Sequence, residues 1–223
     1  MKKIFPACFV LLYWPLHLLI YFLADSIPVS QCHNVTGQLD LLIPFVPAFV
    51  LIYLSWFVWI AVTVIFTLTQ DRRLMVKLHM EFSLVDIISY ACYLIYPTVQ
   101  YLRPDLSSAN GIFEKMLQLF YTIDTPTQVC PSEHVAFAVI LAWTWIELSC
   151  NSRTGRESSM LLALMISLST LFVKQHTILD VALGIPVGFI AIAVVNGHIG
   201  RDISEKFRET IRDHWGRPLH WHL

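Results

Sequence analysis

The sequence predicts an all-α membrane protein with six transmembrane helices in one bundle. Of its 223 residues, 56% are hydrophobic and only 14% are charged, and the mean hydropathy is +0.62. A helix needs about 20 apolar residues to cross a hydrocarbon core about 30 Å thick. Six apolar stretches approach or reach this length, and they lie at residues 4–24, 42–68, 82–101, 134–150, 159–173 and 179–199. No linker or internal repeat divides the chain, so residues 1–223 are expected to form a single integral-membrane domain.

The first of these stretches resembles a signal peptide, and the fifth has the least secure bounds. Residues 4–24 follow two lysines, as a signal peptide would, but the run is long for one and the cleavage-site match is loose. We therefore interpret it as a span. The fifth stretch, at 159–173, is short and needs neighbouring residues to complete it.

The placement of the cations predicts the orientation of the spans. With the N-terminus in the cytoplasm, the cytoplasmic segments hold 12 of the 15 Lys and Arg residues, as the positive-inside rule favours. Both termini are therefore expected in the cytoplasm, with residues 200–223 as a cytoplasmic tail. The remaining cations, Arg103, Lys115 and Lys174, fall on the outer side and need another role.

The longest outer connection, at residues 102–132, contains an amphipathic stretch at 112–121 that predicts a short helix at the outer interface. Cys32 and Cys130 both lie in outer loops. They could form a disulfide in an oxidising compartment or remain reduced.

Ionisable groups at membrane depth are usually functional, because burying them in lipid is costly. Arg103 is expected to end the third span on the outer side. Ser132 can cap the fourth span, whose first turn contains His134, and such a helix start favours an anion. His176 and Asp180 are four residues apart, so we expect both to project from one face at the start of the sixth span.

These residue types suit phosphoryl chemistry. A carboxylate such as Asp180 can fix the tautomer of a histidine such as His176 and leave its other ring nitrogen free to attack or to accept a proton. His134 could then protonate a leaving oxygen, while Arg103 and Lys174 supply positive charge for phosphate oxygens. A surface ion pair and a simple helix cap are the alternatives that remain open.

At these residues the chain resembles the type 2 phosphatidic acid phosphatase (PAP2) superfamily of membrane phosphatases and lipid phosphotransferases. That family carries a Lys-x6-Arg-Pro motif, a Pro-Ser-Gly-His motif and a Ser-Arg-x5-His-x3-Asp motif. The matching residues here are Arg103-Pro104, the "PSEH" at 131–134, and Ser169, His176 and Asp180. The departures are Tyr96, Glu133 and Thr170, which stand where the family has Lys, Gly and Arg. Two phosphate-binding cations are thus missing, and Lys174 is a candidate to compensate.

The resemblance spans about residues 43–184 and is greatest to the branch that includes inositol phosphorylceramide synthases. It implies a PAP2-like bundle of six helices with no metal and no other cofactor. It also implies catalysis by His176 as the nucleophile, Asp180 as its orienting carboxylate and His134 as the acid that protonates the leaving group. Binding of the substrate phosphate would fall to Arg103, Ser132 and Lys174.

The leading prediction is a plasma-membrane lipid phosphate phosphatase that removes a phosphate or diphosphate at the extracytoplasmic face. Its partners would be a lipid phosphate and membrane lipids, with no nucleic acid. A lipid phosphotransferase with the same phosphoenzyme is the alternative. Hydrolysis is favoured because so short a chain has little structure with which to bind a second headgroup and exclude water.

Two other classes stay open at this point. In a metal-dependent hydrolase, His134, His176 and Asp180 would bind a catalytic zinc, or the terminal His220 and His222 would do so. In a channel or transporter, the His176–Asp180 pair would relay protons. The paired broken helices of many transporters are not evident in the sequence.

Overall fold

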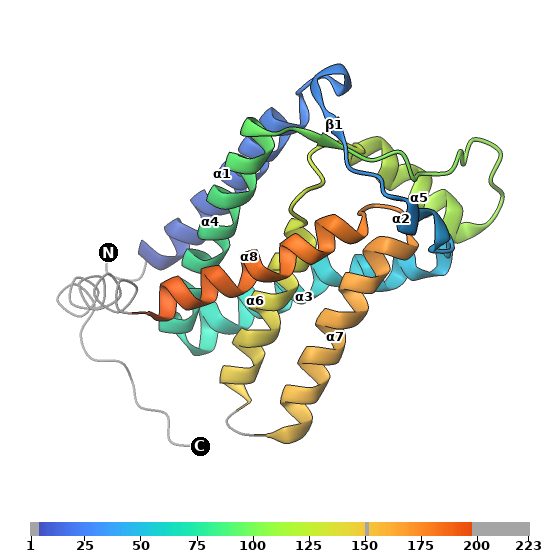
Figure 1. The fold of residues 1–223 in the computed structure, drawn as a ribbon. Coiled ribbons are helices and arrows are strands. Elements are labelled where there is room, and N and C mark those ends of the chain that lie inside the picture. The colour runs from blue at the N-terminus through green and yellow to red at the C-terminus, as the bar shows by residue number, and fades with distance from the viewer. Residues whose placement is uncertain (1–4, 150–151, 198–223) are drawn as a thin grey trace.

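The computed structural model describes residues 5–149 and 152–197, and these residues form eight α-helices and one two-stranded sheet (Figure 1). Six of the helices are long, and each lies where a span is predicted. Their bounds are α1 Phe5–Asp25, α3 Val50–Gln70, α4 Arg72–Ile95, α6 Glu133–Leu148, α7 Arg153–Phe172 and α8 Ile178–Asn196. The predicted helical fold is confirmed for the described residues. The tail predicted at 200–223 lies outside them.

Three segments of the described chain are long and apolar enough to cross a membrane: Pro47–Gln70, Arg72–Ile95 and Ile178–Asn196. The first joins the short 3-10 turn η2 (Pro47–Phe49) to α3. Large apolar side chains are exposed along these helices, including Val58, which is 62% exposed, and Phe189, which is 53% exposed. Such exposure is costly in water and is expected where a helix faces lipid.

The third long helix differs from the predicted span at both ends. α4 begins at Arg72 rather than at residue 82, because the Asp71 carboxylate accepts two backbone N–H groups of its first turn at 2.9 and 3.1 Å. It ends at Ile95 rather than at residue 101, because Pro97 disfavours a helical conformation in the residue before it. Arg103 therefore lies in a loop and does not end the helix.

Short elements cover one end of the bundle. They are η1 (Val29–Gln31), β1 (His33–Asn34), α2 (Gln38–Leu42), β2 (Thr98–Val99) and α5 (Ile112–Ile123). β1 and β2 pair in parallel, and α5 confirms the helix predicted at residues 112–121. Cys32 and Cys130, for which the sequence left a disulfide open, are both free thiols.

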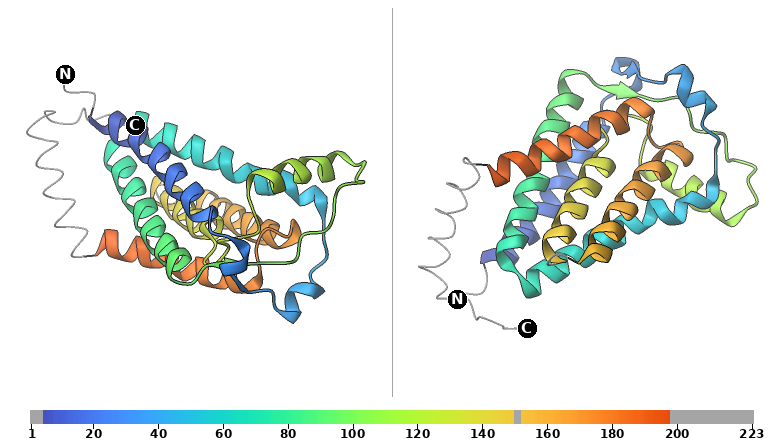
Figure 2. Two further views of the ribbon diagram at one scale, coloured as in Figure 1. Left: turned by 90° about the horizontal axis from the view of Figure 1, so that it is seen from above. Right: turned by 60° about the horizontal axis from the view of Figure 1, so that its bottom comes forward.

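α6 lies at the centre of the bundle and packs against α3, α4, α7 and α8 (Figures 1 and 2). Two glycines allow α8 to approach it closely. A Cβ atom at Gly184 would lie 2.6 Å from the carbonyl oxygen of Ser132, and one at Gly188 would lie 2.8 Å from that of Ala136. Small residues four apart commonly let membrane helices pack at short distance. This contact places the first turns of α6 and α8 side by side.

Candidate active site

His176 lies in the connection between α7 and α8, just before the helix and not inside it. The N-cap of α8 is Thr177, whose hydroxyl accepts the N–H of Asp180 at 3.3 Å. In return the Asp180 carboxylate accepts the N–H of Thr177 at 2.6 Å. This reciprocal arrangement is a capping box. The predicted placement of His176 and Asp180 on one helical face is therefore corrected: Asp180 closes the start of α8, and His176 precedes it.

The nearest hydrogen-bonding partner of the His176 ring is a backbone carbonyl. Nδ1 lies 3.1 Å from the carbonyl oxygen of Val129 and 3.5 Å from Oδ2 of Asp180. A carbonyl oxygen only accepts, so this contact requires the proton on Nδ1 and leaves a lone pair on Nε2. The tautomer that a nucleophile requires is thus supported by the Val129 carbonyl oxygen, which the sequence did not predict. The Asp180 carboxylate is a more distant neighbour.

The two predicted catalytic histidines are in direct contact. Nε2 of His176 lies 3.4 Å from Nδ1 of His134, which is in the first turn of α6. The His134 ring packs against Trp56 and Tyr53, with ring centroids 4.4 and 4.8 Å away. Its Nε2 atom is buried and has no hydrogen-bond partner. The protonation pattern that satisfies these contacts has the Nδ1–H of His134 donating to Nε2 of His176.

Ser132 caps α6, as predicted. Its hydroxyl accepts the backbone N–H of Val135 at 3.4 Å, and its own N–H donates to the carbonyl oxygen of Asp180 at 3.0 Å. The residue is fully buried and joins the starts of α6 and α8. Because its oxygen acts as the acceptor in the cap, its hydroxyl proton can still be donated to a substrate oxygen.

Arg103 lies at the same end of the bundle, with most of its donors engaged. Nη1 donates to the carbonyl oxygen of Asp124 at 2.6 Å, and Nη2 donates to that of Thr125 at 2.9 Å and to Oε1 of Gln175. The guanidinium carbon lies 4.5 Å from the centroid of the Tyr121 ring. Burial lowers the pKa of Arg103, but a guanidinium stays protonated in proteins.

Two N–H groups of the bonded pair Arg103 and Gln175, the latter next to His176 in the chain, are buried without a hydrogen-bond partner: Nε of Arg103 and Nε2 of Gln175. An unsatisfied buried donor costs about 1–3 kcal/mol. These groups are therefore candidates to bind the oxygens of an incoming phosphate. Gln175 did not stand out in the sequence, because a single glutamine carries no motif.

The ammonium group of Lys174 binds the end of α2. Nζ donates to the carbonyl oxygens of Asp40 and Ile43 at 3.0 and 2.6 Å. The residue is 6% exposed, and burial lowers the pKa of its ammonium group. Its backbone φ of 55° lies in the left-handed region. In the structure Lys174 thus ties the α7–α8 connection to α2, and its predicted contact with phosphate remains a prediction.

Asp40 is a residue of this region that sequence reasoning missed. Its Oδ1 accepts the N–H of Ile178, the first residue of α8, at 2.7 Å, and its Oδ2 accepts the N–H of Gly37 at 2.7 Å. It thereby satisfies one of the unpaired N–H groups at the start of α8. Asp40 and Ile178 are 138 residues apart in the chain, and nothing in the sequence signals their pairing.

A sequence profile of the PAP2 superfamily matches residues 80–201, which is more than half of the chain. The chain belongs to the PAP2 superfamily. No curated protein and no solved structure matches it. The matched region holds all six predicted site residues, and membership supports phosphatase or phosphotransferase chemistry. The resemblance to the inositol phosphorylceramide synthase branch stays a prediction.

The side-chain geometry of the PAP2 site does not suit the alternative of a catalytic zinc there. His176 approaches His134 through Nε2 and Asp180 through Nδ1. These nitrogens lie on different sides of the ring, so one ion could not bind both neighbours through the contacts seen. The other zinc alternative, His220 with His222, lies outside the described residues.

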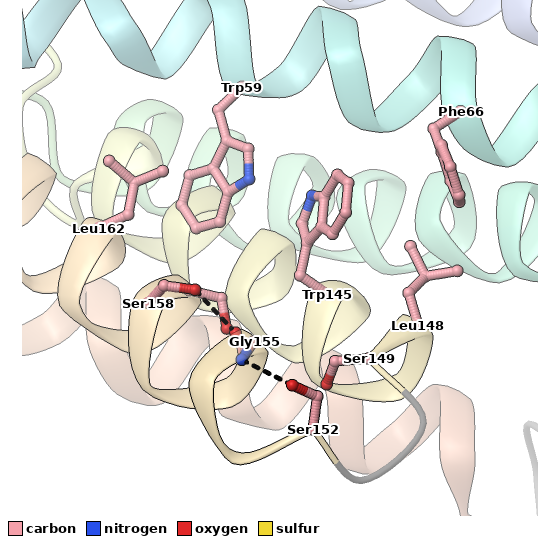
Figure 3. A pocket seen from close by; sticks show the side chains of 10 residues that line it. Trp59, Phe66, Trp145, Leu148, Ser149, Ser152, Gly155, Ser158 and Leu162 are labelled. Atoms are coloured by element: carbon pink, nitrogen blue, oxygen red, sulfur yellow. Dashed lines mark hydrogen bonds between the residues drawn. The ribbon is translucent and has the colours of Figure 1, made fainter.

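A separate cavity of about 490 Å³ lies near the α6–α7 connection (Figure 3). Trp59 of α3 and Trp145 of α6 line it opposite serines of α7. In α7 the Ser158 hydroxyl donates to the Gly155 carbonyl at 3.1 Å, so it is already bonded within its own helix. Trp145 follows His134 by eleven residues, about 17 Å along a helix. The cavity is therefore not part of the histidine site of this PAP2 protein.

Proposed function

We propose that this PAP2 protein is a lipid phosphate phosphatase that removes a phosphate or diphosphate from a membrane lipid through a phosphohistidine on His176. One observation carries the proposal. Nδ1 of His176 is held by the Val129 carbonyl, and its free Nε2 faces Nδ1 of His134. A nucleophile and an acid thus face each other from two helix starts. Membership of the superfamily supports the phosphoester class of substrate.

In the proposed reaction, the Nε2 lone pair of His176 attacks phosphorus and the bond from phosphorus to the leaving oxygen breaks. His134 enters this step as the imidazolium, protonated on both ring nitrogens, and the leaving oxygen takes its Nδ1 proton, which leaves a neutral imidazole. A water molecule then attacks the phosphohistidine, gives a proton to His134, and the P–N bond breaks to release phosphate. Each proton transfer by a positioned side chain contributes about 10²–10⁴-fold to the rate.

Substrate entry must separate the two rings, since 3.4 Å between their nitrogens leaves no room for a phosphoryl group in line. The phosphate oxygens would then lie near the unpartnered N–H groups of Arg103 and Gln175 and the hydroxyl of Ser132. Lys174 could join them only if its ammonium group left the carbonyl oxygens of Asp40 and Ile43.

We also propose six spans, with both termini in the cytoplasm and the site at the extracytoplasmic face of the plasma membrane. The distribution of the cations in the sequence supports this orientation. In the structure, α2, α5 and the start of α8 gather at one end, while the end of α6 and the start of α7 lie at the other (Figure 1). Arg153 and Arg156 lie in the first turn of α7 and would face the cytoplasm.

The proposal is tested with purified full-length protein in nanodiscs and a panel of lipid monophosphates and diphosphates. We expect release of inorganic phosphate from at least one of them, lost in His176→Ala and kept in His33→Ala, a control histidine in β1 outside the site. New phospholipid formed from an added alcohol, without released phosphate, would establish the phosphotransferase instead. An active His176→Ala protein would refute the proposed nucleophile.

A further inference from the structure

A second buried cluster lies among α1, α4 and α6. It consists of His17, Asp86 and Glu133, whose potential ligand atoms all lie within 4.8 Å of one another. Nδ1 of His17 is 3.2 Å from Oδ1 of Asp86. Asp86 is 8% exposed and Glu133 is 9% exposed. Three helices thus direct one imidazole and two carboxylates to one place in the bundle.

The cluster has more acceptor atoms than its neighbours satisfy. Asp86 accepts the hydroxyl of Tyr13 at 2.8 Å, and the Tyr90 hydroxyl lies 3.1 Å from Nδ1 of His17. Oε1 of Glu133 is buried and has no hydrogen-bond partner. Two adjacent carboxylates in a poorly solvated place are unfavourable unless protons or a cation compensate them. The unpartnered oxygen marks the position where such a cation would bind.

We propose that His17, Asp86 and Glu133 bind one divalent transition-metal cation, for which Zn²⁺ is the appropriate probe. One imidazole nitrogen and two carboxylate oxygens are ligands that such ions accept. Metal–ligand bonds of about 2.0–2.2 Å in tetrahedral geometry separate ligand atoms by about 3.4 Å. The 3.2 Å between the His17 and Asp86 atoms, which is also a hydrogen-bond distance, is close to that spacing, and all three potential ligand atoms lie within 4.8 Å of one another. The Tyr13 hydroxyl would orient the Asp86 carboxylate from outside the ligand set.

The bound cation would connect α1 and α4 to the first residue of α6, next to His134. Its role is therefore to fix the start of the helix that carries the proposed acid. The site does not depend on the proposed reaction, because metal binding is measured without a substrate. A proton shared between Asp86 and Glu133 is the competing way to reduce the charge, and it predicts no bound metal.

The test measures zinc per chain in purified full-length protein that carries no affinity tag. His220→Gln and His222→Gln are introduced as a background, so that the terminal histidines do not bind metal. After equilibration with Zn²⁺ and removal of free ion, elemental analysis should find about one zinc per chain. Zinc should also raise the thermal unfolding temperature of this protein.

The variants locate the ion. Glu133→Gln and Asp86→Asn keep side-chain volume and should each weaken zinc binding at least about tenfold. Glu81→Gln, a buried carboxylate of α4 outside the cluster, and His176→Ala should bind zinc like the background. Gel filtration checks that each variant is folded. If one of the two cluster variants does not fold, the zinc binding of the other still tests the site.

Three results would overturn the proposal. The folded protein with His220→Gln and His222→Gln could bind no stoichiometric zinc, as expected if Asp86 and Glu133 share a proton instead. The folded cluster variants could keep full binding. Binding could also be lost in His176→Ala and kept in Glu133→Gln, which would assign the ion to the catalytic histidines.

Discussion

Glu133 and His134 are consecutive residues of α6, yet they belong to two different buried clusters. His134 contacts His176, beside N–H groups that have no acceptor. Glu133 contributes to the cluster of His17 and Asp86, where a carboxylate oxygen has no donor. The first cluster suits an anion such as phosphate, and the second suits a cation. Successive helical residues point about 100° apart, so neighbours in sequence can serve opposite chemistry.

The two clusters also hold their histidines differently. Nδ1 of His176 is nearest to a neutral carbonyl oxygen, at 3.1 Å, with the Asp180 carboxylate at 3.5 Å. Nδ1 of His17 lies 3.2 Å from the Asp86 carboxylate and 3.1 Å from the Tyr90 hydroxyl. The carbonyl acceptor fixes which ring nitrogen of His176 carries the proton, whereas the close carboxylate at His17 also offers negative charge to a cation.

The largest expected difference in activity is between the variants of His176 and of His17. His176→Ala removes the phosphoryl acceptor, so kcat should fall by about 10⁴-fold or more. His17→Ala removes the imidazole of the other cluster and should cause a much smaller loss. Phosphate release by the two folded variants is the measurement. Equal losses would show that the clusters do not have separate roles.

The next largest expected difference is between the variants of His134 and of its neighbour Glu133. His134→Ala should lower kcat/KM by about 10²–10⁴-fold for a lipid alkyl phosphate, and by less for a substrate whose leaving group needs no proton. The loss caused by Glu133→Gln should not depend on the leaving group. Rates for a matched pair of good and poor leaving groups check this. A leaving-group dependence that is the same in both variants would contradict the role of His134 as the acid.

Asp180→Asn tests whether a carbonyl or a carboxylate holds His176. The amide keeps an oxygen that can accept the Thr177 N–H, and the Val129 carbonyl still accepts from Nδ1. We therefore expect a loss in kcat of about tenfold or less, well short of the roughly 10⁴-fold loss that follows when a carboxylate alone fixes a catalytic tautomer. A loss near the larger figure, in a protein of unchanged thermal stability, would make Asp180 the main orienting group.

The smallest expected effect on activity concerns Lys174, a cation bound to carbonyl oxygens. Lys174→Met should leave kcat/KM within about twofold and lower the free energy of unfolding by about 1–2 kcal/mol, because two carbonyl oxygens lose a charged donor. Lys115→Met, on α5, serves as the control. A phosphate-binding role predicts a different result, an activity loss of about tenfold at unchanged stability.

Much of the helical fold was predictable, because runs of about 20 apolar residues have few other stable arrangements. The bounds of α4 were not, since Arg72 and Lys77 are polar residues in its first turns and resemble a cytoplasmic loop in the sequence. The parallel pairing of β1 with β2 was also missed. It joins two-residue strands that have no alternating pattern.

The residue types of the candidate site were predictable from motif spacing, which brings His134, His176 and Asp180 to one end of the bundle. Their partners were not. The Val129 carbonyl belongs to the backbone and carries no sequence signal, while Asp40 meets α8 only through tertiary packing. The cluster around Glu133 was missed for the same reason, because His17 and Asp86 come from different helices, α1 and α4.

The central claim, a phosphohistidine on His176, is tested most directly by trapping. The protein is mixed with a lipid phosphate labelled with ³²P and quenched within one turnover, and the labelled peptide is then identified. We expect a label that is labile in acid and stable in base, on the peptide that contains His176, and absent in His176→Ala. Phosphate release without any labelled protein, or a label that persists in His176→Ala, would contradict the account.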